Sequence, residues 1–89
     1  MLSKNVMSHR RAHVDIVAAI LRLAKSGSRK TRIVYGANLN FKLLNEYLAK
    51  LEKAGLIAED SVNSGVIRTT EKGKRFLQHY EAFREFGMP

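Results

Sequence analysis

The fold of this chain is decided by residues 30–55, which read KTRIVYGANLNFKLLNEYLAKLEKAG. Within this stretch, residues 30–35 predict a short helix that Gly36 closes, and a tight turn follows. Asn40 then predicts the start of another helix, because its side-chain oxygen can accept a hydrogen bond from a free backbone N–H group. We expect this helix to run over 41–54 and to stop at the glycine that closes the stretch. Two helices joined in this way form a helix-turn-helix.

The apolar residues of the second helix recur at the three- and four-residue spacing of one helical face. We expect that face to be buried, and its members are Phe41, Leu44, Leu48 and Leu51. Leu39 precedes the cap and Leu44 follows it by four residues, which is the spacing of a hydrophobic staple. The opposite edge of the helix is polar and is left to solvent or to a ligand.

The segments on either side of the helix-turn-helix complete the pattern. Upstream, residues 10–25 predict a helix, because their apolar positions share one face and Gly27 can stop the helix. Downstream, LIAED (56–60) and VIRTT (66–70) are strand-like runs with Asn, Ser and Gly between them. Two such runs around turn-forming residues predict a β-hairpin.

A last helix follows the hairpin. Thr70 can cap its start, and we expect it to end near Glu85. The predicted order is helix, helix, helix, strand, strand, helix, which is a mainly α fold with a small β-hairpin. This is a winged helix-turn-helix extended by one helix. We expect a flexible N-terminal arm over 1–8, the winged helix-turn-helix domain over 9–69, and a C-terminal helix over 70–89 as a dimerisation element.

The positive charge is confined to the first half of the chain. Residues 1–45 hold nine Lys or Arg and one acid, whereas residues 46–89 hold seven of each sign, so the net charge of +8 belongs to the first half. A half of one sign is typical of a surface that binds a polyanion. With no cysteine and no apolar run of membrane-spanning length, we expect a single cytoplasmic domain on the nucleoid.

The sequence lacks the motifs that an enzyme of this size would need. It has no phosphate-binding glycine loop, no dinucleotide-binding glycine motif and no HExxH. His9 and His13 lie one helical turn apart, which is a metal-like spacing, but no third ligand converges with them. We therefore expect neither catalysis, nor a metal or other cofactor, nor a small-molecule substrate.

The order of elements favours double-stranded DNA as the polyanion. In a helix-turn-helix the second helix enters the major groove, and the first braces it against the backbone. Asn can bond adenine, Lys can bond guanine, and a basic helix start suits phosphate. On the second helix, the predicted contacts are Asn40, Lys42, Asn45, Glu46 and Lys50. The predicted backbone and minor-groove contacts are Arg10, Arg11, Arg29, Lys30, Thr31 and Arg32. The predicted wing contacts are Asn63, Ser64 and Arg68, and we expect their share to be modest.

Aromatic residues of the last helix extend beyond what a three-helix core covers. The predicted seam consists of Phe76, Tyr80, Phe83 and Phe86. A twofold contact between two copies would bury this seam and stabilise a small domain, so we expect a homodimer. A monomer in which the same residues cap the core is the alternative.

Four stretches of the chain carry a family resemblance. They are DIVAAIL (15–21), KTRIVYGANLNFKLLNEYL (30–48), AGLI (54–57) and TTEKGKRFL (69–77). They resemble an archaeal winged helix family of transcriptional regulators and ten-kilodalton chromatin proteins. The resemblance implies double-stranded DNA binding, a wing formed by the hairpin and dimerisation through the last helix. It also implies DNA contacts at Arg32, Asn40, Lys42 and Asn45. The predicted last helix is shorter than the long coiled-coil helix of the chromatin proteins, so the geometry of a dimer stays open.

Three functions remain open at this point. A transcriptional regulator would read a particular site, whereas a chromatin protein would bind duplex DNA with low specificity. A winged helix can also act as a protein-interaction module, because a fold does not fix a function. Single-stranded RNA binding is disfavoured, since stacking aromatics are not expected on the surface.

Overall fold

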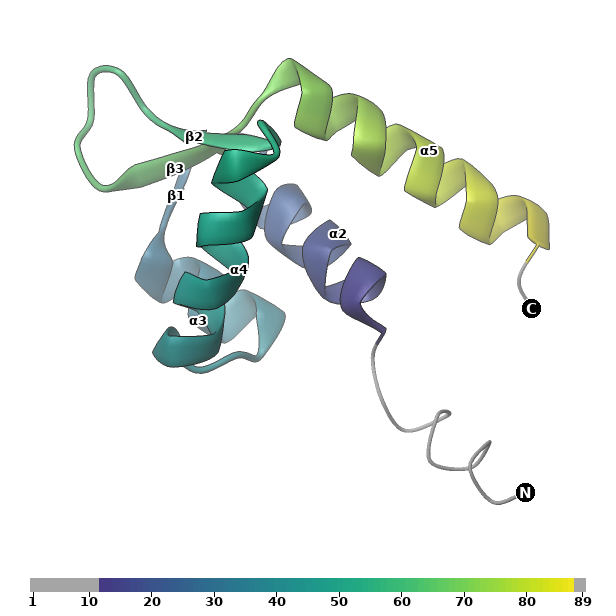
Figure 1. The fold of residues 1–89 in the computed structure, drawn as a ribbon, viewed down its shortest axis with the longest axis horizontal. Coiled ribbons are helices and arrows are strands. Elements are labelled where there is room, and N and C mark those ends of the chain that lie inside the picture. The colour runs from purple at the N-terminus through teal and green to yellow at the C-terminus, as the bar shows by residue number, and fades with distance from the viewer. Residues whose placement is uncertain (1–11, 88–89) are drawn as a thin grey trace.

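The computed structural model describes residues 12–87 of the chain. Its elements are α2 (His13–Leu23), β1 (Ser28–Arg29), α3 (Lys30–Ala37), α4 (Phe41–Lys53), β2 (Ile57–Glu59), β3 (Val66–Thr69) and α5 (Glu71–Gly87) (Figure 1). The predicted winged helix-turn-helix is confirmed, with one strand more than expected, β1. The predicted arm over 1–8, together with Arg10 and Arg11, falls outside the described residues.

The ends of helix α2 are set by residues close to them in the sequence. Ala12 is extended at its N-cap (φ −69°, ψ 157°), and the Asp15 carboxylate accepts a hydrogen bond from the Ala12 N–H at 3.3 Å. The helix ends at Leu23, two residues before the predicted end. The C-cap is Ala24 (φ −90°), so Gly27 is not the residue that stops the helix; at φ +94° it closes the turn between α2 and β1. The side chains that α2 buries are Ala18, Ile20 and Leu21.

Helix α3 is longer than the sequence predicted. It continues through Gly36 to Ala37, and the residue in the left-handed conformation is Asn38, at φ +58°. The prediction that Gly36 closes the helix is therefore wrong. A Cβ atom at Gly36 would lie 2.8 Å from the Leu23 side chain, so this glycine permits the close approach of α3 to α2.

Helix α4 begins where the sequence predicted. The Asn40 Oδ1 atom accepts a hydrogen bond from the Leu43 N–H at 2.7 Å. Its buried face differs by one residue from the prediction, and consists of Leu44, Tyr47, Leu48 and Leu51. Phe41 is not a core residue, since 47% of its surface is exposed. The face is centred between Tyr47 and Leu48, and Phe41 lies off its edge.

The three strands form one antiparallel sheet in the order β1-β3-β2. Strand β3 is central: Ser28 pairs with Ile67 on one side, and Glu59 pairs with Ile67 on the other. Strand β1 was not predicted, because two residues carry no periodicity. It attaches the start of α3 to the hairpin that forms the wing. The wing extends to one side of the domain, away from α5 (Figure 1).

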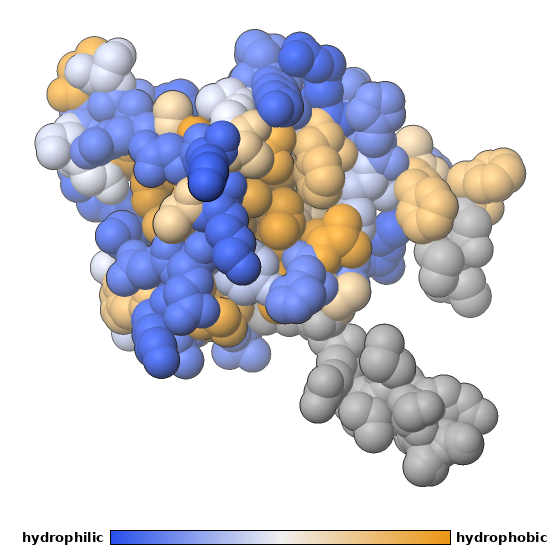
Figure 2. Space-filling view, in the orientation of Figure 1, coloured by the Kyte–Doolittle hydropathy of each residue, from blue (hydrophilic) through white to orange (hydrophobic). Residues whose placement is uncertain are grey.

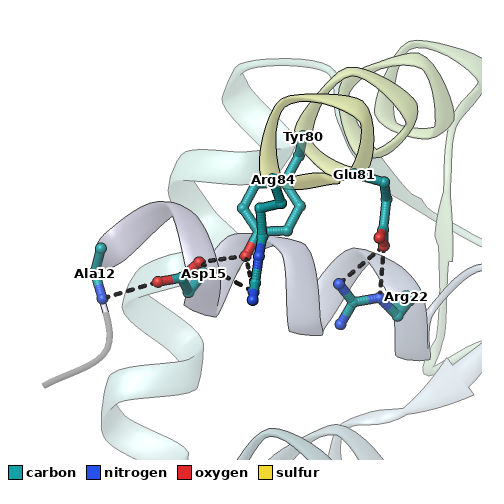
Figure 3. Close-up of polar contacts among 6 residues, drawn as sticks. All are labelled: Ala12, Asp15, Arg22, Tyr80, Glu81 and Arg84. Atoms are coloured by element: carbon teal, nitrogen blue, oxygen red, sulfur yellow. Dashed lines mark hydrogen bonds and ion pairs between the residues drawn. The ribbon is translucent and has the colours of Figure 1, made fainter. Parts of the chain in front are cut away.

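Helix α5 packs against α2. Thr70 caps it as predicted, since its Oγ1 atom accepts a hydrogen bond from the Gly73 N–H at 3.0 Å. Tyr80 is 8% exposed, and its hydroxyl donates to the Asp15 carboxylate (Figure 3). Tyr80 is thus a core residue of this chain rather than the exposed seam position that the sequence suggested. The helix runs to Gly87, beyond the predicted end.

The free end of α5 is apolar and exposed. Phe83 is 68% exposed and Phe86 is 93% exposed, whereas Phe76 packs partly against the core. Figure 2 shows the apolar side chains at this end of the molecule. Among the described residues, no helix combines the length and the apolar character that crossing a membrane requires.

Candidate nucleic-acid interface

The start of α3 is an exposed basic surface. Its four predicted phosphate contacts are all exposed, and they are Arg29, Lys30, Thr31 and Arg32. No side chain caps the first turn of α3, whose N-cap residue is Arg29. Free N–H groups at a helix start and fixed positive charge both favour a bound anion. The geometry of this turn therefore suits a phosphate group.

Arg29 joins this basic surface to the wing. Its Nη1 atom donates a hydrogen bond to the Ser64 carbonyl oxygen at 3.1 Å. A Cβ atom at Gly65 would lie 2.9 Å from the same nitrogen, and Gly65 has φ +87°. The wing turn and the start of α3 thus form one continuous surface, and a glycine is needed where they meet.

The polar edge of α4 is exposed, as predicted, at Lys42, Asn45, Glu46 and Lys50. The predicted base contact at Asn40 has fewer free hydrogen-bonding groups than the sequence suggested. The Asn40 Oδ1 atom already accepts a hydrogen bond in the helix cap, so Asn40 offers a base its amide N–H groups and only one remaining lone pair of Oδ1. Among the described side chains, none bonds the Asn45 amide, so Asn45 retains both its donor and its acceptor for adenine.

A groove of about 410 Å³ separates α4 from the wing. Its α4 wall includes Asn45 and Ala49, its wing wall includes Glu59 and Gly65, and Lys30 of α3 also lines it. The groove brings residues from three elements to one surface. Sequence spacing predicted the members of that surface, but not this common groove.

The wing turn is held by its own carboxylates. The Asp60 carboxylate accepts hydrogen bonds from the Asn63 N–H at 2.8 Å, the Arg68 Nε–H at 2.8 Å and the Val62 N–H at 3.0 Å. These bonds lower the pKa of Asp60 to about 2. Arg68 is therefore paired, and the wing has little free positive charge. The predicted contacts Asn63 and Ser64 are exposed at the turn.

Of the ion pairs of residues 12–87, one lies in the wing and the other three lie on α2 and α5. They are Arg22–Glu81, Arg68–Asp60, Lys74–Glu71 and Arg84–Asp15, and they involve α2, α5 and the wing. Figure 3 shows two of them between α2 and α5. Within the described part of the chain, no cation of β1, α3 or α4 has a carboxylate at ion-pair distance. Their positive charge is thus not neutralised by the protein itself.

Two aromatic residues near the turn are exposed, although the sequence did not predict either of them to lie on the surface. Tyr35 of α3 is 77% exposed, and Phe41 begins α4. The sequence placed Phe41 in the core because it fits the spacing of the leucines. Including Tyr47 in that pattern rotates the buried face and moves Phe41 out of it, so the signal was present in the sequence.

His13, expected as an exposed polar position, has a structural partner. Its Nδ1 atom lies 2.5 Å from the Tyr47 hydroxyl, and the ring centroids are 5.9 Å apart. This contact joins the start of α2 to the buried face of α4. Across residues 12–87, no cluster of three or more His, Cys, Asp or Glu side chains has the arrangement of a metal site.

Comparison with known proteins is consistent with this geometry. Residues 10–87 match the winged helix-turn-helix family. The chain is 32% identical over 77 residues to an uncharacterized protein of Methanocaldococcus jannaschii, a match that covers 84% of this chain and 76% of that protein. The structure of the present chain is similar to the crystal structure of Sso10a-2, a DNA-binding protein from Sulfolobus solfataricus. The match between this chain and Sso10a-2 has a TM-score of 0.76 at 33% sequence identity, and it covers 84% of this chain and 80% of Sso10a-2.

Proposed function

We propose, from the premise that this chain belongs to the winged helix-turn-helix family, that it binds double-stranded DNA. The observation that carries the proposal is the separation of charges. The cations of β1, α3 and α4 surround an exposed helix edge and lack a carboxylate at ion-pair distance, whereas the described ion pairs are on α2, α5 and the wing. A surface of unpaired cations gains most from phosphates, because binding releases their counterions. The similarity to the DNA-binding Sso10a-2 supports the same function.

Phosphate contacts supply most of the affinity in this proposal. Arg29, Lys30, Thr31 and Arg32 meet the DNA backbone at the start of α3. Arg10 and Arg11 of the N-terminal arm add further backbone or minor-groove contacts. Such contacts position a protein on the duplex without reading its sequence. We therefore expect them to act alike on every duplex.

Base contacts come from the polar edge of α4. Asn45 pairs with adenine through its unoccupied amide, and Lys42 donates to guanine. Asn40, Glu46 and Lys50 flank this pair, and the Asn40 amide oxygen is partly occupied by the helix cap. The wing follows the neighbouring backbone or minor groove through Asn63 and Ser64. Arg68 has a smaller part, because Asp60 holds its guanidinium.

A second copy of the chain is the partner that suits the free end of α5. Phe83 and Phe86 are largely exposed there, and burying them stabilises a small domain. Phe76 continues the same helix toward the core. A twofold pair would carry two copies of α4 into two major-groove sites. Sedimentation velocity tests this: Phe83→Ala combined with Phe86→Ala should convert a dimer to a monomer, and a wild-type monomer would contradict it.

We propose a binding role as a transcriptional regulator on the nucleoid, rather than a catalytic one. The test is a mobility-shift assay in increasing salt, which compares a random duplex with duplexes selected from a random pool. A regulator should prefer the selected duplexes by at least about a thousandfold, as is common for site-specific proteins. Asn45→Ala should reduce that preference. Equal binding to both would make the protein a low-specificity chromatin protein, and binding to neither would contradict the proposed function.

A further inference from the structure

The first residue of α4 presents an aromatic ring to solvent. Phe41 is 47% exposed, although the residues around it on the edge of α4 are polar. Half of a phenyl ring in water is unfavourable, and burying it in a complex recovers that free energy. Its place at the start of the helix matters, because the first turns of this helix are the ones that enter the major groove.

Phe41 lies in line with two other exposed residues of α4. Asn45 follows it by four residues and Ala49 by eight, and positions four apart share one side of a helix. Both Asn45 and Ala49 line the groove between α4 and the wing. Phe41 itself does not line the groove, so phenyl ring, amide and methyl group form a ladder along one edge of α4, of which the last two members face the wing. Successive members are about 6 Å apart along the helix axis.

This ladder is the chemical complement of one kind of base pair. In the major groove, an A·T pair presents the N7 and N6 atoms of adenine beside the C5-methyl group of thymine. A G·C pair presents no methyl group there. Asn45 has the donor and acceptor for adenine, and Phe41 has apolar surface for thymine. Ala49 is small enough to let the bases approach the helix.

We infer that Phe41 is a specificity-determining residue that packs on thymine C5-methyl groups, and that the preferred ligand is duplex DNA with A·T pairs under the first turns of α4. The inference rests on the proposed DNA binding and adds a substrate class to it. Phe41 and Asn45 are separated by about two base steps of 3.4 Å, so they read neighbouring but different positions.

The test removes the methyl group without changing the charge or the pairing of the DNA. Fluorescence anisotropy compares an alternating A·T duplex with the same duplex containing deoxyuridine in place of thymine. The wild-type protein should bind the deoxyuridine duplex about fourfold more weakly for each methyl group that Phe41 covers, the factor that corresponds to about 0.8 kcal/mol. Phe41→Ala should reduce this ratio to about twofold or less, and Phe41→Leu should retain most of it.

A matched control is available on the same turn. Leu43 is 36% exposed and lies about 200° around the helix axis from Phe41. Leu43→Ala removes a similar apolar side chain from the other flank, so the ratio of thymine to deoxyuridine binding should stay at the wild-type value. Circular dichroism melting checks that both variants fold. A second test adds methyl groups to the DNA and uses only the wild-type protein. Replacing cytosine by 5-methylcytosine in an alternating G·C duplex should strengthen the binding of the wild-type protein.

The outcomes separate the inference from the function on which it rests. Wild-type protein that binds the thymine and deoxyuridine duplexes equally overturns the role of Phe41, even if the binding is strong and salt-dependent. A loss of discrimination in Leu43→Ala as large as that in Phe41→Ala also overturns it. If the wild-type protein binds none of these duplexes at low salt, the proposed function itself is contradicted. If Phe41→Ala does not fold, the wild-type protein still tests the inference in two comparisons: thymine against deoxyuridine, and cytosine against 5-methylcytosine.

Discussion

Replacing Lys30 by Ala should change how strongly DNA binding depends on salt. Lys30 is the first residue of α3, is exposed, and lines the groove between α4 and the wing. No carboxylate of the described residues pairs with it, so its charge is available to a phosphate. Alanine is a good helix former, and the substitution leaves α3 intact.

The size of the effect follows from the number of cations at the interface. Three described basic residues are proposed to meet phosphates: Arg29, Lys30 and Arg32. If each neutralises one phosphate, these three alone make the logarithm of the binding constant fall with the logarithm of salt at a slope of about −2.7 per protomer. Affinity then drops roughly 40-fold between about 50 and 200 mM salt. Lys30→Ala should make the slope shallower by about 0.9, equally for every duplex.

The assay is fluorescence anisotropy with one labelled duplex over a series of salt concentrations. Arg75→Ala is the matched control, because Arg75 is an exposed cation of α5, outside the proposed interface. Both variants lower the net charge by one, so a general charge effect would shift both slopes alike. Identical slopes for Lys30→Ala and Arg75→Ala would refute the assignment of Lys30. A wild-type slope near zero would refute the electrostatic basis of binding altogether.

Three further predictions concern the framework that holds the interface. Tyr80→Phe removes the hydroxyl that donates to Asp15, and should lower the free energy of unfolding by about 1–2 kcal/mol in urea titrations. Gly73→Ala places a Cβ atom 2.2 Å from the Leu56 carbonyl oxygen, so α5 must shift, and we expect a cost of about 3 kcal/mol and a fall in Tm of about 12 °C or more. Asp60 has a folded-state pKa of about 2, below the ordinary 3.8, so its stabilisation of the wing is fully present above pH 3.8 and is lost as the pH falls through 2. The amide NMR shifts of the wing turn should titrate with that midpoint, and Asp60→Asn should abolish the transition.

Each of these predictions has an outcome that contradicts it. Unchanged unfolding of Tyr80→Phe would mean that water replaces the hydroxyl at Asp15 without loss. A Gly73→Ala variant that melts at the wild-type temperature would mean that α5 and the turn before β2 can separate at little cost. A wing transition with its midpoint near pH 3.8 would mean that the hydrogen bonds to Asp60 do not favour its charged form.

The helix caps and the turn glycine were predictable from the sequence. Asn40 and Thr70 were identified as helix caps because each side chain satisfies a backbone N–H group only three residues away. The left-handed conformation of Gly27 was also predicted, although helix α2 is capped three residues before it, at Ala24. Such signals lie within one turn of chain, so their meaning does not change with the rest of the molecule.

The faces of the elements were predicted less well, because burial is decided by the whole core. Phe41 and Tyr47 both fit an apolar pattern, and only the packing of α4 on its neighbours buries one and exposes the other. Gly36 was interpreted as a turn residue, but its role depends on Leu23 in another helix. The contact of Tyr80 with Asp15 joins residues 65 positions apart, which no spacing argument could pair.

What the sequence alone determined is the order of the elements, the caps that separate them and the confinement of net charge to the first half of the chain. These follow from local backbone chemistry and from simple counting. The tertiary structure decided which charges are free. It pairs Arg22 with Glu81 and Arg84 with Asp15 between α2 and α5, and leaves the cations of β1, α3 and α4 without a carboxylate at ion-pair distance. It also created strand β1, because a two-residue strand exists only through its pairing with β3.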